Sequence, residues 1–123
     1  MRIISGTLKG KTISFLKSTS TRPLKDSVKE NIFNIIFHSK KIDINFDKSN
    51  ILDLYSGVGS FGLECISRGA KKIVFVEKDK QAVGILKKNL FDLSISNKAN
   101  IFFGKIENFL KNKAPDRFDL IFL

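Results

Sequence analysis

The chain has 123 residues, with 22 Lys and Arg against 12 Asp and Glu, and a formal net charge of +10 at pH 7. This length allows one domain and is small for a complete doubly wound enzyme. The positive charge favours a polyanionic partner such as nucleic acid. Cys65 is the single cysteine, and neither a signal-peptide pattern nor a membrane-length apolar stretch occurs. We therefore expect a cytoplasmic protein without membrane contacts or internal disulfides.

Residues 2–15 contain two short β-type runs around a turn that carries glycine and lysine. This pattern predicts a β-hairpin from which Arg2, Lys9 and Lys11 project. Such cations can contact a phosphate backbone, although a hairpin that only exposes its charges to water fits the sequence equally well. A polar loop containing Arg22 and Lys25 follows, so residues 1–25 form a basic hairpin and loop extension.

Residues 26–48 are predicted to form a helix and a linker. Ser27-x-x-Glu30 matches a capping box, which places the start of the helix there and its end at about His38. Apolar residues follow at helical spacing, namely Val28, Ile32, Ile35 and Ile36. We expect this stripe to pack on the rest of the domain.

Residues 49–123 are organised around the stretch 51–62. An apolar run that includes Asp53 is followed by Gly57-x-Gly59-x-x-Gly62 and then by a helical pattern that Gly69 stops. A strand, a glycine turn and a helix in this order form half of a nucleotide-type cofactor site.

The choice of cofactor depends on Asp53. The glycine spacing alone fits a dinucleotide fingerprint, in which backbone N–H groups approach a pyrophosphate. A carboxylate at the end of the strand would repel that pyrophosphate by about 4 kcal/mol at ~4 Å and an effective dielectric near 20. A cofactor without phosphate and with a cationic amino group would be attracted instead. S-adenosylmethionine has these properties, whereas a nicotinamide cofactor accounts for the glycines but not for Asp53.

Glu77 follows Gly57 by twenty residues and closes the next apolar run, Ile73 to Val76. A carboxylate at the end of the second strand can accept hydrogen bonds from ribose hydroxyls, so Glu77 supports an adenosine ligand without identifying it. The alternative for both acids is a pair of solvated loop carboxylates.

The remaining elements alternate between strands and helices. They are predicted over residues 72–77, 80–90 with Asp79 as cap, 99–103, 106–112 and 118–123. This alternation indicates an α/β fold with a Rossmann-like parallel sheet, cut after its fourth strand.

Four blocks of the sequence together carry a family resemblance. They are Arg2-Ile3-Ile4-Ser5-Gly6-x-x-Lys9-Gly10, Thr21-Arg22-Pro23 with Asp26 and Glu30, Asp53-Leu54-Tyr55-Ser56-Gly57-Val58-Gly59-Ser60-Phe61-Gly62, and Phe118-Asp119-Leu120-Ile121-Phe122-Leu123. Through them nearly the whole chain resembles the bacterial 16S ribosomal RNA guanine-N2 methyltransferases of the RsmD type.

The resemblance implies methyl transfer from S-adenosylmethionine to the exocyclic N2 amine of a guanine in 16S ribosomal RNA or an assembling small subunit. We also expect no metal, and a monomer when the protein is full length. The residues expected to bind the cofactor are Asp53, Leu54, Tyr55, Ser56, Gly57, Gly59, Glu77, Lys78, Lys105 and Ile106. Those expected to contact RNA are Arg2, Lys9, Lys11, Arg22 and Lys25.

In such enzymes an Asp- or Asn-Pro-Pro-aromatic motif supplies the groups that accept hydrogen bonds from the target amine. We expect this motif immediately after Leu123, so the 123 residues by themselves are expected to be inactive. Three alternatives stay open. They are a methyltransferase acting on DNA, protein or a small-molecule amine, an NAD-dependent oxidoreductase, and a non-catalytic RNA-binding module.

Overall fold

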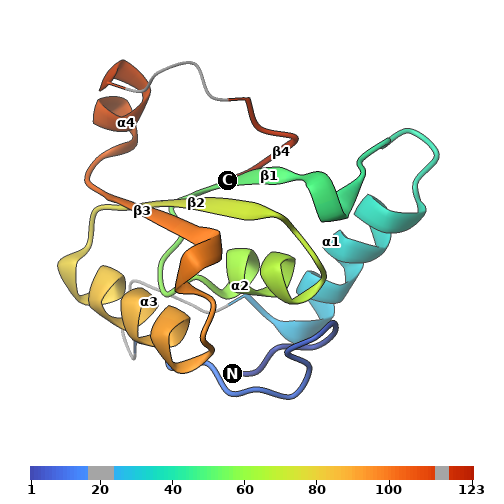
Figure 1. The fold of residues 1–123 in the computed structure, drawn as a ribbon, viewed down its shortest axis with the longest axis horizontal. Helices are drawn as coiled ribbons and strands as arrows, with labels where there is room; N and C mark the ends of the chain where they lie inside the picture. Colours follow the sequence, from blue (N-terminus) through green and yellow to red (C-terminus); the bar gives the residue numbers. More distant parts are fainter. Residues whose placement is uncertain (17–23, 113–116) are drawn as a thin grey trace.

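The computed structural model describes residues 1–16, 24–112 and 117–123. These residues form a four-stranded parallel sheet in the order β3-β2-β1-β4 (Figure 1). The strands are β1 Asn50–Leu54, β2 Lys72–Glu77, β3 Ala99–Phe103 and β4 Leu120–Phe122. The predicted α/β parallel sheet is confirmed. Because the strand order reverses between β1 and β4, a crevice is expected beside the carboxyl end of β1.

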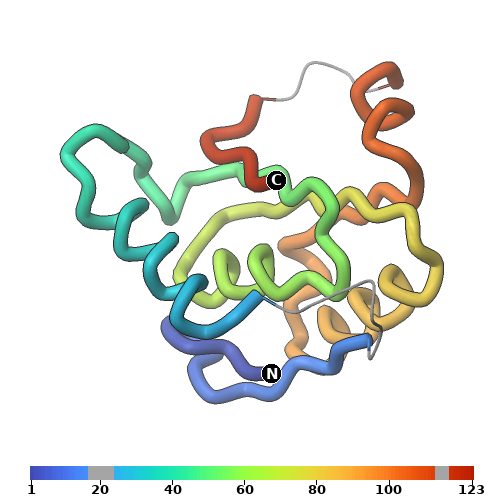
Figure 2. Tube along the Cα trace, turned by 180° about the vertical axis from the view of Figure 1, so that it is seen from behind, coloured from blue at the N-terminus to red at the C-terminus, as the bar shows by residue number. Residues whose placement is uncertain are grey.

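Helices cover both faces of the sheet. They are α1 Asp26–His38, α2 Ser60–Ser67, α3 Lys80–Asp92 and α4 Ile106–Asn112, with short 3-10 helices at Phe46–Lys48 and Ser96–Lys98. Figures 1 and 2 show α1, α2 and α3 on one face and α4 on the other. Ile73 and Phe75 of β2 join the core beneath α2 and α3, whereas Val74 and Val76 pack with Phe109 of α4. This double burial explains the unbroken apolar run of β2.

The element ends follow the local chemistry of the sequence. The Asp79 carboxylate accepts a hydrogen bond from the Gln81 N–H, as predicted, and α3 continues to Asp92, two residues past the expected end. Gly69, with φ at +109°, terminates α2. The predicted bounds of β2, β3 and α4 agree with the structure.

One prediction for α1 is wrong and a second is half right. The helix begins at Asp26 after Lys25, and no side chain caps it, so Ser27 and Glu30 form no capping box. Of the predicted stripe, Ile36 is buried and Ile32 packs against the core, whereas Val28 and Ile35 are 42% and 58% exposed. Lys29 and Phe33 are buried instead. The helix is rotated about its axis relative to the predicted orientation for two reasons. The ring of Phe33 stacks on Phe61 of α2 at 5.1 Å between centroids, and Lys29 forms an ion pair with Glu64 inside the domain.

The predicted N-terminal hairpin is present in short form. Its arms form one antiparallel bridge between Arg2 and Thr12, and backbone hydrogen bonds also join them on both sides of this bridge. Ile3 and Ile13 flank this bridge and are fully buried in the main core. The segment is therefore packed against the domain and does not stand free in water. The loop at residues 17–23, including Arg22, lies outside the described residues.

None of the helices in the described part of the chain combines the length and apolarity that crossing a bilayer requires.

Candidate functional site

The loop between β1 and α2 turns tightly through left-handed backbone conformations. Tyr55, Gly57 and Gly59 have φ angles of 54°, 58° and 95°. A Cβ at Gly59 would lie 2.4 Å from Cδ1 of Leu86, so this position requires glycine. A Cβ at Gly57 would meet nothing within 4 Å, which leaves that backbone accessible from the crevice. The left-handed backbone conformation of Tyr55 is strained, and backbone strain of this kind is concentrated at functional sites.

Asp53 lies at the carboxyl end of β1 with only 1% of the residue exposed. Its Oδ2 accepts a hydrogen bond from the Gly62 N–H at 3.2 Å. Burial raises the pKa of Asp53 to about 7, the Gly62 hydrogen bond opposes this rise, and the charge of Glu77 adds to it. A buried carboxylate with one hydrogen bond is short of partners, so a cation beside it would be stabilised.

Glu77 connects β2 to the glycine loop. Its Oε1 accepts the Gly57 N–H at 2.8 Å, and its Oε2 accepts the N–H groups of Lys78 and Asp79 at 3.0 and 2.9 Å. A carboxylate offers about four lone-pair sites, so capacity remains for a ligand hydroxyl. The contact with Gly57 was not foreseen from the sequence, which predicted only the position of Glu77 at a strand end.

Two cavities meet at Tyr55, which is 66% exposed. The first, of about 450 Å³, contains the polar residues Asp53, Ser56 and Ser60. Its apolar wall is built from Met1, Phe15, Leu16, Leu24, Val28, Phe61 and Phe122. The second, of about 480 Å³, is lined by Glu77, Lys78, Gly104, Lys105 and Ile106, among others. Together they form an elongated site across the carboxyl ends of β1, β2 and β3.

The structure brings together most of the predicted cofactor residues. Asp53, Tyr55, Ser56 and Gly57 line the first cavity, and Glu77, Lys78, Lys105 and Ile106 line the second. Two of the predicted residues line neither cavity. Leu54 packs into the core on the α4 side, and Gly59 lies in the turn with its backbone close to Leu86.

The donor set of the first cavity fits the amino-acid end of S-adenosylmethionine. Within the described residues, Ser56 Oγ is buried without a hydrogen-bond partner. It faces the same cavity as the Asp53 carboxyl group. A ligand with both an ammonium group and hydrogen-bonding oxygens would satisfy both groups. A pyrophosphate would instead place its charge beside Asp53 and close to Glu77.

The predicted RNA-binding cations separate into two groups. Lys25 is exposed and lines the first cavity, and the Arg2 side chain is 71% exposed, 3.9 Å from Asp26. Lys9 and Lys11 are exposed at a turn that is bound to Ser67, at the far end of α2 from the cavity. The fifth predicted cation, Arg22, belongs to the segment left undescribed.

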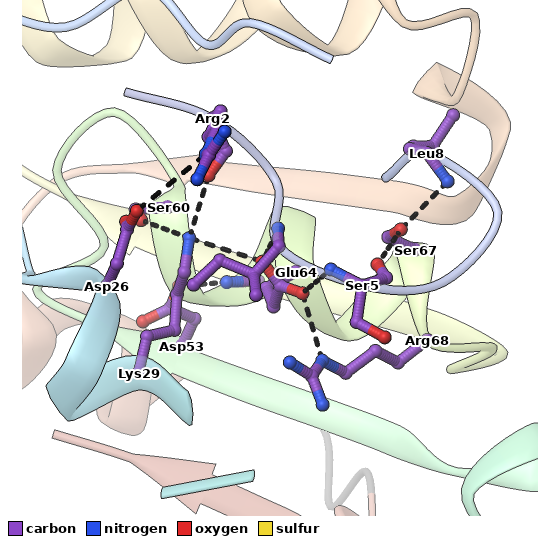
Figure 3. A network of polar contacts seen from close by, with 12 residues as sticks. Arg2, Ser5, Leu8, Asp26, Lys29, Asp53, Ser60, Glu64, Ser67 and Arg68 are labelled. Atoms are coloured by element: carbon purple, nitrogen blue, oxygen red, sulfur yellow. Dashed lines mark hydrogen bonds and ion pairs between the residues drawn. The ribbon is translucent and has the colours of Figure 1, made fainter. Parts of the chain in front are cut away.

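A buried ionic network behind the first cavity was missed at the sequence level (Figure 3). Lys29 and Glu64 are fully buried, with Nζ 3.2 Å from Oε1, and Arg68 Nε donates to Glu64 Oε2 at 2.9 Å. Burial pushes the pKa of Glu64 up, but hydrogen bonds from Ile4, Arg68 and Ser5 and the charge of Lys29 outweigh burial and leave it below its usual value. The only signal for this network was the spacing of Glu64 and Arg68, four residues apart on one helix.

No group of three or more His, Cys, Asp or Glu side chains in the described residues could hold a metal ion. Cys65 is a free, buried thiol, and burial raises its pKa well above the usual value. Its role is therefore in packing.

Comparison with known proteins gives consistent relatives. The family model described as conserved hypothetical protein 95 matches residues 1–123. The chain is 38% identical over 125 residues to ribosomal RNA small subunit methyltransferase D of Haemophilus influenzae, covering 100% of this chain and 62% of that protein. It is 37% identical to the protein of the same name from Buchnera aphidicola, covering 100% of this chain and 59% of the relative. The chain thus spans about six tenths of the length of these relatives.

Solved structures agree with the fold. A hypothetical protein from Thermus thermophilus is 28% identical, with a TM-score of 0.75 over 90% of this chain and 59% of its own. Protein arginine methyltransferase 10 of Arabidopsis thaliana shares the fold alone, at 21% identity and a TM-score of 0.62 over 78% of this chain and 26% of its own. With a family model matched along its whole length, this chain belongs to the RsmD family, described as conserved hypothetical protein 95.

Proposed function

We propose that this protein transfers a methyl group from S-adenosylmethionine to the exocyclic N2 amine of a guanine in 16S ribosomal RNA. The observation that carries the proposal is the pair of carboxyl groups, Asp53 and Glu77, that close adjacent parallel strands on either side of Tyr55. Repulsion of about 4 kcal/mol at ~4 Å would disfavour a pyrophosphate beside Asp53. The same charge favours the ammonium group of a methionine moiety.

In this proposal the site binds the cofactor in two parts. Asp53 and Ser56 hold the amino-acid end in the first cavity, and Glu77 accepts a hydrogen bond from the ribose. Lys78, Lys105 and Ile106 border the adenine in the second cavity. When bound, the cofactor supplies an electrophilic methyl group on a sulfonium. The protein contributes orientation, because both cavities open from rigid strand ends of the sheet.

The acceptor is proposed to enter over the apolar wall of the first cavity. The rings of Phe61 and Phe122 stack there at 3.8 Å between centroids and 6° between planes, and a flat base could lie beside them. The guanine amine is a poor nucleophile, so alignment with the methyl group supplies much of the catalysis. Arg2 and Lys25 would contact phosphates near this entrance. A ribosomal acceptor is supported by the names of the relatives, and the N2 atom by the family resemblance.

The proposed partner is 16S ribosomal RNA, free or in an assembling small subunit. The protein would act as a monomer in the cytoplasm, where subunits assemble. Unstacking the target base is less costly in RNA loops than in duplexes.

Nucleoside analysis tests the acceptor. The complete product of the gene is incubated with methyl-tritiated S-adenosylmethionine and unmodified small-subunit RNA or particles, and the RNA is digested. Label in N2-methylguanosine is expected. Label in methylated adenosine or in protein would contradict the proposal, and boiled protein provides the control.

A further inference from the structure

Lys29 is a fully buried cation on α1. Its ammonium group is 3.2 Å from Glu64 Oε1 and donates to the Arg2 carbonyl at 3.3 Å and to Ser60 Oγ at 3.4 Å. Apolar side chains of similar volume commonly replace buried ion pairs without loss of stability. The pair is therefore a candidate for a role other than stability.

The N-terminal segment is fixed to α2 by contacts that do not involve Lys29. Glu64 accepts the N–H groups of Ile4 and Ser5 at 2.9 and 3.0 Å, and Ser67 Oγ accepts the Leu8 N–H at 2.9 Å. In Figure 3, Lys29 lies on the opposite side of Glu64 from Arg68 and points toward Ser60. Within this network, the contact from Lys29 to Ser60 is the one that reaches the first cavity.

The direction of this hydrogen bond determines what Ser60 can offer. A lysine ammonium group can only donate, so Ser60 Oγ acts as the acceptor toward Lys29. The hydroxyl proton of Ser60 is then free to donate to another group. Ser60 is the first residue of α2 and lines the cavity with Asp53 and Ser56. The positive end of the helix dipole at this point also favours an anion.

We propose that Ser60 donates a hydrogen bond to the carboxylate of the cofactor's amino-acid end and that Lys29 is the positioning residue that orients its hydroxyl. This inference rests on the proposed function and adds a recognition element to it. Asp53 binds the ammonium group, and Ser60 binds the carboxylate of the same moiety. Glu64 pairs with Lys29 at 3.2 Å and with Arg68 at 2.9 Å, so the charge of Lys29 is engaged within the network and Lys29 acts through the orientation of Ser60.

Two ligands separate this role from a general effect on the pocket. S-adenosylhomocysteine carries both the ammonium and the carboxylate group. S-adenosyl-3-thiopropylamine keeps the ammonium and lacks the carboxylate. Calorimetry with wild-type protein, Ser60→Ala and Asp53→Asn measures both affinities. We expect Ser60→Ala to weaken S-adenosylhomocysteine about tenfold or more and to leave the amine ligand within about twofold. Asp53→Asn, the control, weakens both ligands.

The variant Lys29→Met tests the positioning role. Glu64 keeps its ionic partner Arg68 in this variant, with Nε 2.9 Å from Oε2, so no buried charge is left unpaired. We expect the same selective loss of affinity for the carboxylate-bearing ligand as in Ser60→Ala. An unchanged affinity ratio in this variant would overturn the role of Lys29.

Other results separate the inference from the proposed function. Equal weakening of both ligands by Ser60→Ala, or no weakening, would overturn carboxylate recognition while the cofactor assignment stands. If wild-type protein fails to bind S-adenosylhomocysteine, the proposed function fails and this inference fails with it.

Discussion

Asp53 combines a structural cost with the functional use that we propose for it. Its side chain is buried, it accepts one hydrogen bond, and its pKa is raised to about 7. Near neutral pH the carboxyl group therefore exists in both protonation states. A cationic ligand binds the ionised state and would shift the group toward it. The residue is in this sense prepared for a positive ligand at the expense of stability.

Because burial disfavours the ionised carboxyl group of Asp53, we predict that the effect of Asp53→Asn on stability depends on pH. Because the folded pKa lies above the unfolded value near 3.8, the folded state binds more protons between these two pH values. The contribution of Asp53 to stability is thus complete below about pH 4 and is lost as pH rises to about 7. The amide cannot ionise and can still accept the Gly62 N–H.

We expect Asp53→Asn to be more stable than wild type at pH 8 by roughly 1–3 kcal/mol, and closer to wild type at pH 5. Urea unfolding of both proteins at the two pH values measures this difference. The same difference in unfolding free energy at pH 5 and pH 8 would show that Asp53 does not titrate in the folded state near neutrality.

Single residues of the site differ in how far the sequence predicts them. Asp53 and Glu77 were predicted because strand ends are recognisable from apolar runs, and the structure places both beside the cavities. Lys29 and Ser60 were missed because their contact joins residues 31 positions apart. A buried lysine also contradicts the usual rule that lysine is exposed, so nothing in the sequence pattern indicated that Lys29 is buried.

At the scale of elements, the α2 helix packs closely on β2 at Gly62. A Cβ at this position would lie 2.3 Å from Cε1 of Phe75, whereas a Cβ at Gly84 in α3 would meet nothing within 4 Å. Both glycines are inside helices, so the intrinsic preference for alanine applies equally to them. Only the packing differs.

The same substitution should therefore have opposite effects at the two positions. We expect Gly62→Ala to destabilise the protein by about 1–3 kcal/mol through overpacking. Gly84→Ala should stabilise it by about 0.5–1 kcal/mol. Thermal and urea unfolding of both variants measure the effects. A stabilised Gly62→Ala variant would show that the α2 and β2 contact is looser than described.

Elements were predictable where local chemistry decides them. The bounds of β2 and β3 were predicted correctly because each strand is an apolar run between polar residues. The cap of α3 was predicted correctly because Asp79 bonds a backbone N–H only two residues away. The buried face of α1 was not fully predictable, because it depends on contacts with Phe61 and Glu64, which are distant in sequence. The hairpin was predicted from its two β-type runs, but its packing was not, because the burial of Ile3 and Ile13 depends on a core built from distant segments.

At the scale of the whole molecule, the site joins segments that are far apart in the sequence. The N-terminal segment and α1 supply the apolar wall, the loop after β1 supplies the polar groups, and the ends of β2 and β3 supply the second cavity. The strand order β3-β2-β1-β4 makes this possible, because it opens the sheet next to β1. The chain as a whole carries a net charge of +10, which favours a polyanionic partner.

We propose that Asp53 selects a cationic amino-acid moiety over a pyrophosphate. This selectivity is tested most directly by calorimetric titration of the protein at pH 8 with S-adenosylhomocysteine and, separately, with NAD. We expect S-adenosylhomocysteine to bind at least about tenfold more tightly than NAD and Asp53→Asn to remove most of this preference. Tighter binding of NAD, or a preference that Asp53→Asn leaves unchanged, would contradict the proposal.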